Sequence, residues 1–111
     1  MTSGATAADA ALGRAAAAGR AIQRVGARVF ERRDSVWTDL RHGDSLRVVT
    51  VAPFSDAYFA LLRALPELVQ PAALAPAVLV AGARVSIKIQ EGGRSSWGAG
   101  ELEGLVREFR S

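Results

Sequence analysis

Residues 46–65, LRVVTVAPFSDAYFALLRAL, join a strand pattern to a helix pattern across a single proline. The first part is rich in β-branched residues, which favour an extended strand. Pro53 ends this strand because proline lacks a backbone donor and pushes the preceding residue towards an extended conformation. Ser55 is a good helix N-cap, since its hydroxyl can accept a hydrogen bond from a free amide of the first turn. The stretch therefore predicts one principal helix over Ser55–Leu65.

This helix carries an apolar stripe that needs an apolar surface to pack against. Four large apolar residues recur at helical spacing: Tyr58, Leu61, Leu62 and Leu65. Phe54 and Phe59 occupy the two positions of a hydrophobic staple, which would fix the angle between strand and helix. We therefore expect the stripe and both phenylalanines to be buried in the core.

Short alternating patterns before the helix predict a three-stranded meander. Val29 and Phe30 lie in one candidate strand, and residues 36–40 alternate between apolar and polar after the turn residues Asp34 and Ser35. The Val-rich strand of residues 46–51 follows after one more turn. Because consecutive strands with short connections tend to pair, we expect these three strands to be antiparallel neighbours.

The second half of the chain predicts a helical corner and a second hairpin. Prolines at 66, 71 and 76 disfavour a continuous helix, so we expect short turns with three aliphatic residues packed beneath them, namely Leu68, Val69 and Leu74. Residues 77–81 are all apolar and residues 85–89 alternate, which indicates a hairpin with a doubly buried first strand. The predicted fold class is α+β, with a small, mainly antiparallel sheet of about five strands and one principal helix packed on a face.

Composition divides the chain into three parts. Residues 1–21 are almost entirely Ala, Gly, Ser and Thr, which predicts an Ala-rich arm or linker because little of it can be buried. Residues 22–91 hold the α+β domain. Residues 92–111 begin with a Gly-rich spacer, GGRSSWGAG, which is typical of a flexible coil, and continue with a short amphipathic helix over residues 101–110.

The net charge of +3 comes from the N-terminal third of the chain. Between residues 14 and 33 the arginines face a single acidic residue, Glu31, whereas the segment from residue 51 onward is balanced. A candidate basic patch comprises Arg24, Arg28, Arg32 and Arg33. Such a patch could bind the phosphates of nucleic acid without sequence preference, although a solvated charged face is the more common outcome.

The absence of cysteine excludes disulfides and thiolate metal sites. No apolar run approaches the roughly 20 residues needed to span a bilayer, and the N-terminus lacks the basic start and apolar centre of a signal peptide. The absence of cysteine does not decide the compartment, because many exported proteins also lack cysteine.

No constellation of residues predicts catalysis. His42 is the single histidine, and a hydrolase triad would have to combine it with Asp39 or Asp44 and with Ser35 or Ser45. These are turn-forming residues close together in sequence, without the preorganised pocket that a nucleophile and its base require. The glycines at 92, 93 and 98 match neither a phosphate-binding loop nor a dinucleotide fingerprint, and the aspartates are too widely spaced for a calcium loop. We predict no catalytic residue, no cofactor and no metal ion.

A partner contact is predicted near the C-terminus. Trp37 alternates with the face of a hairpin and fits the core, whereas Trp97 lies in the Gly-rich spacer. The following helix has an apolar stripe that can pack on its own domain or on a neighbour. The candidate contact residues are Trp97, Leu102, Leu105 and Phe109.

Residues 23–89 resemble the segment that follows the von Willebrand factor type A domain in large bacterial surface or secreted proteins. The most specific matches are V-W-x-D at residues 36–39, S-D-A-Y-F at residues 55–59 and L-P-E-L at residues 65–68. The resemblance implies a non-catalytic accessory module beside a ligand-binding domain, in the cell envelope or outside the cell. The chain lacks D-x-S-x-S, the metal-site signature of the type A domain, so adhesion through a metal ion is not implied.

These observations favour a non-enzymatic accessory or protein-interaction module that belongs to a longer chain. Its partner would be another protein or a neighbouring domain of the same chain. The alternative is non-specific nucleic-acid binding through the N-terminal arginine-rich stretch.

Overall fold

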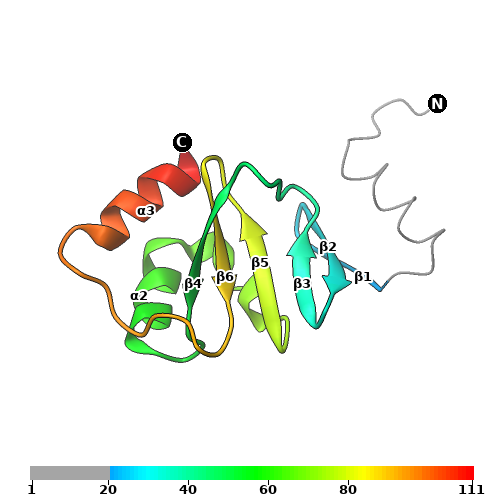
Figure 1. Cartoon of the computed structure of the whole chain (residues 1–111), viewed down its shortest axis with the longest axis horizontal. Helices are drawn as coiled ribbons and strands as arrows, with labels where there is room; N and C mark the ends of the chain where they lie inside the picture. Colours follow the sequence, from blue (N-terminus) through cyan, green and yellow to red (C-terminus); the bar gives the residue numbers. More distant parts are fainter. Residues whose placement is uncertain (1–20) are drawn as a thin grey trace.

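The structure is a computed structural model, and it describes residues 21–111. The predicted Ala-rich arm therefore lies, except for Ala21, outside the described residues. Figure 1 shows the order of the elements along the chain. They are β1 (Ile22–Val25), β2 (Arg28–Arg33), β3 (Val36–Asp39), β4 (Arg47–Val51), α2 (Asp56–Ala64), the 3₁₀ turns η1 (Pro66–Leu68) and η2 (Pro71–Ala73), β5 (Ala77–Ala81), β6 (Val85–Ile89) and α3 (Glu101–Arg110).

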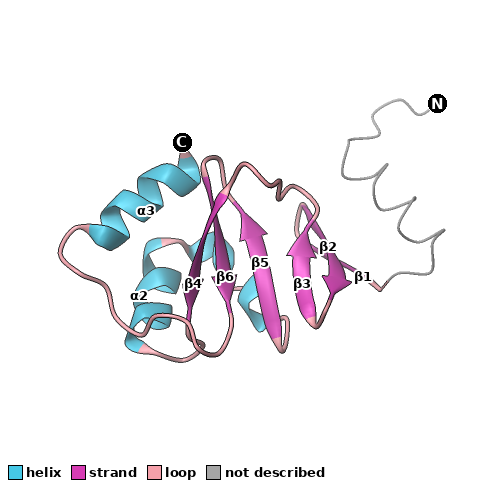
Figure 2. Cartoon of the chain, viewed as in Figure 1, coloured by secondary structure: helices cyan, strands magenta, loops and turns pink. Residues whose placement is uncertain are grey.

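The strands form one mixed sheet in the order β1-β2-β3-β5-β6-β4, drawn in magenta in Figure 2. The β1–β2, β2–β3 and β5–β6 pairs are antiparallel, whereas β3–β5 and β4–β6 are parallel. The α+β class is confirmed, but the expectation of about five mainly antiparallel strands is wrong. The described residues form six strands in a mixed sheet.

The predicted meander fails at β4, which lies beside β6 at the edge of the sheet and not beside β3. Every residue of β5 is buried, so this strand takes an interior position between β3 and β6. Arg47 and Val48 of β4 are exposed, as suits an edge strand. The sixth strand, β1, is a four-residue edge strand with two polar residues and gives little signal in the sequence.

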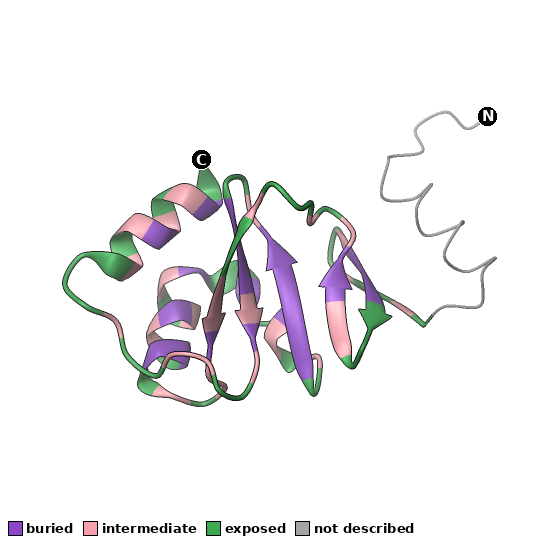
Figure 3. Cartoon of the chain, in the orientation of Figure 1, coloured by how far each residue is buried: buried purple, intermediate pink, exposed green. Residues whose placement is uncertain are grey.

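The main hydrophobic cluster lies on one face of the sheet. Because side chains alternate along each strand, the strand register places Phe30, Val78, Ile89 and Val51 on the same face. These residues belong to one cluster with buried residues of α2, η1 and α3. Figure 3 shows the resulting purple regions on the inner strands and on the helices. The apolar faces of both described α-helices therefore contribute to a single core.

Helix α2 begins as predicted but without the predicted staple. Ser55 Oγ accepts a hydrogen bond from Tyr58 N at 3.2 Å, which confirms the N-cap. Phe59 is 46% exposed and Phe54 is 74% exposed, so the expectation that both are buried is wrong. Phe54 instead lies against Tyr58, with ring centroids 5.2 Å apart. The apolar stripe holds, since Tyr58, Leu61 and Leu65 are buried.

The helical corner after α2 is confirmed by η1 and η2, each of which has a proline at its first position. Leu68 is completely buried and Leu74 is half-buried, as expected. Val69 is 52% exposed and does not pack beneath the corner. Val69 follows Leu68 at the end of a 3₁₀ turn with three residues per turn, so the two side chains point in different directions.

Leu61 and Phe59 of α2 differ in burial, so their substitution should differ in its effect on stability. Leu61→Ala should lower the free energy of unfolding by about 2–5 kcal/mol, because it removes a fully buried side chain. Phe59→Ala should cost less than about 1 kcal/mol, because nearly half of this side chain already faces water. Urea denaturation of both variants measures the difference. Equal losses would contradict the placement of α2.

The Gly-rich segment between β6 and α3 is bonded to the rest of the domain, in contrast to the predicted flexible coil. Arg94 forms a parallel bridge with Val51, donating its N–H to Thr50 O at 3.0 Å and accepting from Ala52 N at 2.9 Å. A Cβ at Gly93 would lie 2.7 Å from Val51 N. Glycine therefore permits close approach to the outer edge of β4 here.

A buried carboxylate connects strands that are distant in the chain. Asp39 Oδ2 accepts from Arg28 Nη1 at 2.6 Å and from Ala81 N at 3.0 Å, and Oδ1 accepts from Arg41 N at 3.0 Å. Arg28 also donates to Ala81 O at 2.7 Å and lies over the ring of Phe109. Four hydrogen bonds thereby connect β2, β3 and β5, and the contact of Arg28 with the Phe109 ring adds α3.

Removing this carboxylate should destabilise the whole domain. Asp39→Ala leaves the partly buried Arg28 without its counter-ion and Ala81 N without its acceptor, so we expect a loss of about 3–5 kcal/mol. Asp44→Ala, at an exposed position of the loop after β3, is the matched control and should change stability by less than about 0.5 kcal/mol. Chemical denaturation measures both, and a loss below about 1 kcal/mol for Asp39→Ala would contradict this role.

Candidate functional site

The residues considered for a hydrolase triad are not brought together. The Asp39 carboxylate is engaged by Arg28, Ala81 and Arg41, and His42 Nδ1 lies 2.8 Å from Ser86 Oγ instead. Ser86 is completely buried, so its hydroxyl is not accessible to a substrate in this structure. Across residues 21–111, no group of three acidic or histidine side chains is placed to hold a metal ion. In the same range, no helix has the length and apolarity to cross a membrane.

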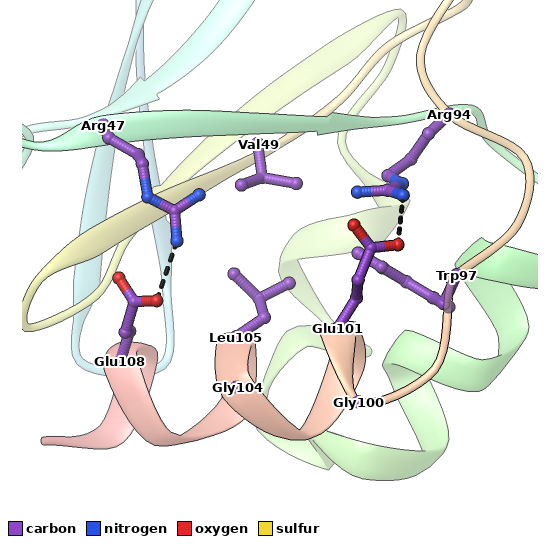
Figure 4. A pocket seen from close by; sticks show the side chains of 9 residues that line it. All are labelled: Arg47, Val49, Arg94, Trp97, Gly100, Glu101, Gly104, Leu105 and Glu108. Carbon is purple, nitrogen blue, oxygen red and sulfur yellow. Dashed lines mark hydrogen bonds and ion pairs between the residues drawn. The ribbon is translucent and has the colours of Figure 1, made fainter.

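A charged cleft of about 270 Å³ separates α3 from β4 (Figure 4). At one end Arg47 Nη2 donates to Glu108 Oε2 at 2.8 Å, and at the other Arg94 Nη2 donates to Glu101 Oε1 at 2.6 Å. Leu105 lies between the two ion pairs. The two ion pairs hold α3 against β4. Because each arginine is paired with a glutamate, the cleft presents no net charge to a ligand.

Two of the four predicted partner-contact residues are buried inside the domain. Leu105 and Phe109 belong to the core cluster, and Leu102 and Trp97 pack against it. Trp97 Nε1 donates to Ala57 O at 3.0 Å. The turn between β5 and β6 donates Ala83 N to Phe109 O and Arg84 N to Glu108 O, which satisfies terminal carbonyls of α3. The apolar stripe of α3 is therefore occupied by its own domain and is not displayed to a partner.

Three ion pairs hold α3, and two of them involve carboxyl groups with lowered pKa. The Arg110 side chain, which donates to Glu67, lowers the pKa of Glu67 below its ordinary 4.5. The pKa of Glu101 is also lowered from 4.5, first by the hydrogen bond from Gly98 N and then by Arg94. Because these carboxyls titrate at lower pH when folded, their stabilisation is present above about pH 4.5 and is lost as the pH falls through their folded pKa values.

Acid should therefore loosen α3 before the sheet unfolds. Below about pH 4.5 we expect weaker protection of the Trp97 indole N–H from hydrogen exchange, relative to a free indole at the same pH, because this N–H is bonded to Ala57 O in the docked arrangement. Glu67→Gln combined with Glu101→Gln should reduce this pH dependence, whereas Glu103→Gln, an exposed change on the same helix, should not. NMR exchange rates from pH 6 to pH 3 measure it, and identical profiles for all three proteins would contradict the assignment.

The four arginines of the predicted basic patch do not gather on one face. By strand register, Arg28 and Arg32 lie on the core face of the sheet, whereas Arg24 and Arg33 lie on the opposite face. Arg28 is paired with Asp39, and Arg33 Nε donates to Glu31. Two of the four charges thus already have a carboxylate partner.

A second cavity, which the sequence did not indicate, is an apolar groove of about 590 Å³ at one end of the sheet. Since β4 and β6 are parallel, their carboxyl ends lie at the same edge, and the segments that leave them meet the corner before β5. Tyr58 and Leu62 of α2 form part of its wall. The remaining lining residues are Pro53, Phe54, Val69, Ala72, Ala73, Leu74, Ala75, Pro76, Ile89 and Glu91.

Phe54 is the most unusual residue of this groove. Its φ of 61° lies in the left-handed region, which is rare for a bulky side chain and costs roughly 1–2 kcal/mol. Its ring is nevertheless 74% exposed, so little burial offsets this cost. With Val69, also exposed, it gives the groove an apolar rim. Exposed apolar patches beside a groove are typical of sites that contact other proteins.

Local sequence reasoning missed the groove for a physical reason. Its lining comes from four separated segments, between residues 53 and 91, which meet only through the parallel β4–β6 pair and the 3₁₀ corner. The available signal was Phe54 itself, a large aromatic residue between Pro53 and the N-cap Ser55. The staple motif predicts burial for this residue, because it places Phe54 at the correct spacing from Phe59.

Comparison of the chain with models of known protein families, with curated proteins and with solved structures gives no match. The features of the domain itself therefore carry the functional argument.

Proposed function

We propose that this domain is a non-enzymatic protein-interaction module and that the apolar groove beside Phe54 is its contact surface. The observation that carries the proposal is the exposed ring of Phe54 on a left-handed backbone. Backbone strain that is not offset by burial within the domain is characteristic of functional positions. An aromatic anchor beside an apolar groove is also the usual form of a hot spot in protein interfaces.

The proposal agrees with an accessory role in a longer chain. The resemblance to the segment after a von Willebrand factor type A domain supports a position beside a ligand-binding domain. The residues that carry that resemblance have structural roles in this domain: Asp39 holds β5, Trp37 Nε1 donates to Ala75 O at 3.0 Å, and Ser55 caps α2. These structural roles do not explain the groove or the exposed ring of Phe54 beside it.

The nucleic-acid alternative receives less support. A phosphate-binding surface needs cations on one side of the molecule, but the described arginines of the basic patch lie on both faces of the sheet. The ion pair of Arg28 with Asp39 is also structural, so recruiting this arginine to phosphate would cost stability.

Photo-crosslinking from inside the groove tests the proposal. With p-benzoylphenylalanine in place of Ala73, an exposed lining residue, ultraviolet irradiation in the producing cell should yield a discrete protein adduct. Phe54→Gly should lower the adduct yield at least about tenfold, the effect expected of a hot-spot residue. The fold should survive this change, because glycine adopts a positive φ without strain.

Two matched controls make the result specific. Phe59→Ala removes an exposed aromatic ring of α2 that does not line the groove, so it should leave the yield unchanged. The same crosslinker at Glu103, exposed on α3, should not give the adduct. A yield that is insensitive to Phe54→Gly, or equal from both crosslinker positions, would refute the groove as the contact surface.

A further inference from the structure

We infer that the occupant of the groove is a protein segment with apolar side chains and an adjacent lysine or arginine, whose cation pairs with Glu91. This inference rests on the proposed function, and it adds the chemistry of the partner. The inference is based on the negative charge of Glu91 in the lining of the groove and on the placement of Arg94 and Lys88 away from it.

Among the described residues that line the groove, Glu91 is the one that carries a charge. It is exposed, and within residues 21–111 its carboxylate has no hydrogen-bond or ion-pair partner. The acidic residues Glu67, Glu101 and Glu108 are each paired with an arginine in this range. The groove therefore combines apolar walls with one unpaired negative charge.

Nearby cations of the domain are not available to Glu91. Arg94, three residues later, donates to Glu101 and to Ser96 O, and its guanidinium lies 4.6 Å from the ring centroid of Trp97. Lys88, three residues earlier, is the strand-register neighbour of Leu79 and Thr50. Its side chain therefore lies on the face of the sheet opposite Ile89 and the groove. Within the described residues neither of these two cations pairs with Glu91, which leaves its carboxylate open to a cation of the occupant.

The size and chemistry of the groove match a short segment of protein. Its volume of about 590 Å³ lies within the range of roughly 300–1,000 Å³ typical of small-molecule pockets, so it can admit a few side chains of a short segment. Apolar walls from Leu62, Leu74 and Pro76 suit aliphatic or proline side chains, and the exposed ring of Phe54 lies beside them. A single charge at such a site adds little affinity, but it fixes orientation and rejects acidic partners.

Selection from a random 12-residue peptide library on the immobilised full chain provides the test. Peptides that bind the unmodified chain, but not the Phe54→Gly variant, should share two or three apolar residues with a lysine or arginine close by. For one such peptide, replacing that basic residue with glutamine should weaken binding about 2–5-fold, as expected for an exposed ion pair. Fluorescence polarisation measures the affinities.

Glu91→Gln should abolish this preference, so that both peptides bind the variant equally. Glu103→Gln, an equivalent change on α3, should preserve the 2–5-fold ratio. Equal binding of both peptides to the unmodified chain would overturn the inference, and so would a library that yields no peptide dependent on Phe54. Neither result would by itself refute the interaction module, whose test is the crosslinked adduct and its dependence on Phe54.

Discussion

The carboxylate of Asp39 is the constraint on which the arrangement of the domain depends. A completely buried carboxylate is unfavourable unless donors surround it, and here the donors come from β2, β5 and the loop after β3. Satisfying this one group fixes β5 beside β3 in parallel register. Since β6 follows β5 through a tight turn, β4 is left with the outer edge beside β6. The mixed sheet is therefore linked to one buried ion pair.

The same ion pair connects the sheet to the C-terminal helix. Arg28 bonds to Asp39 and lies over the ring of Phe109, while the backbone of the β5–β6 turn donates to the last carbonyls of α3. A Cβ at Gly82 would overlap the Phe109 ring, so this turn requires glycine for close packing. Part of the basic charge that suggests phosphate binding is thus used within the fold. The C-terminal helix, in turn, is a structural element and not a free contact surface.

The candidate contact surface arises at the edge where β4 and β6 end. Their parallel pairing brings Pro53, Phe54 and Glu91 together, and the 3₁₀ corner supplies the opposite wall. Within this groove the domain places its most exposed aromatic ring and a carboxylate without a partner in the described residues. The groove is also larger, at about 590 Å³, than the cleft of about 270 Å³ beside α3, whose charges are paired within the domain, which makes the groove the strongest candidate for function.

The sequence by itself determined the local elements: the N-cap at Ser55, the buried stripe of α2, the hairpins β2–β3 and β5–β6, and the span of α3. Each depends on periodicity, capping or turn residues within about ten positions. Only the tertiary structure decided that β4 pairs with β6, that Gly93 permits close approach to β4 and that Phe54 is exposed. These outcomes depend on contacts between distant segments, above all those of Asp39 with Arg28 and Ala81, for which local periodicity carries no information.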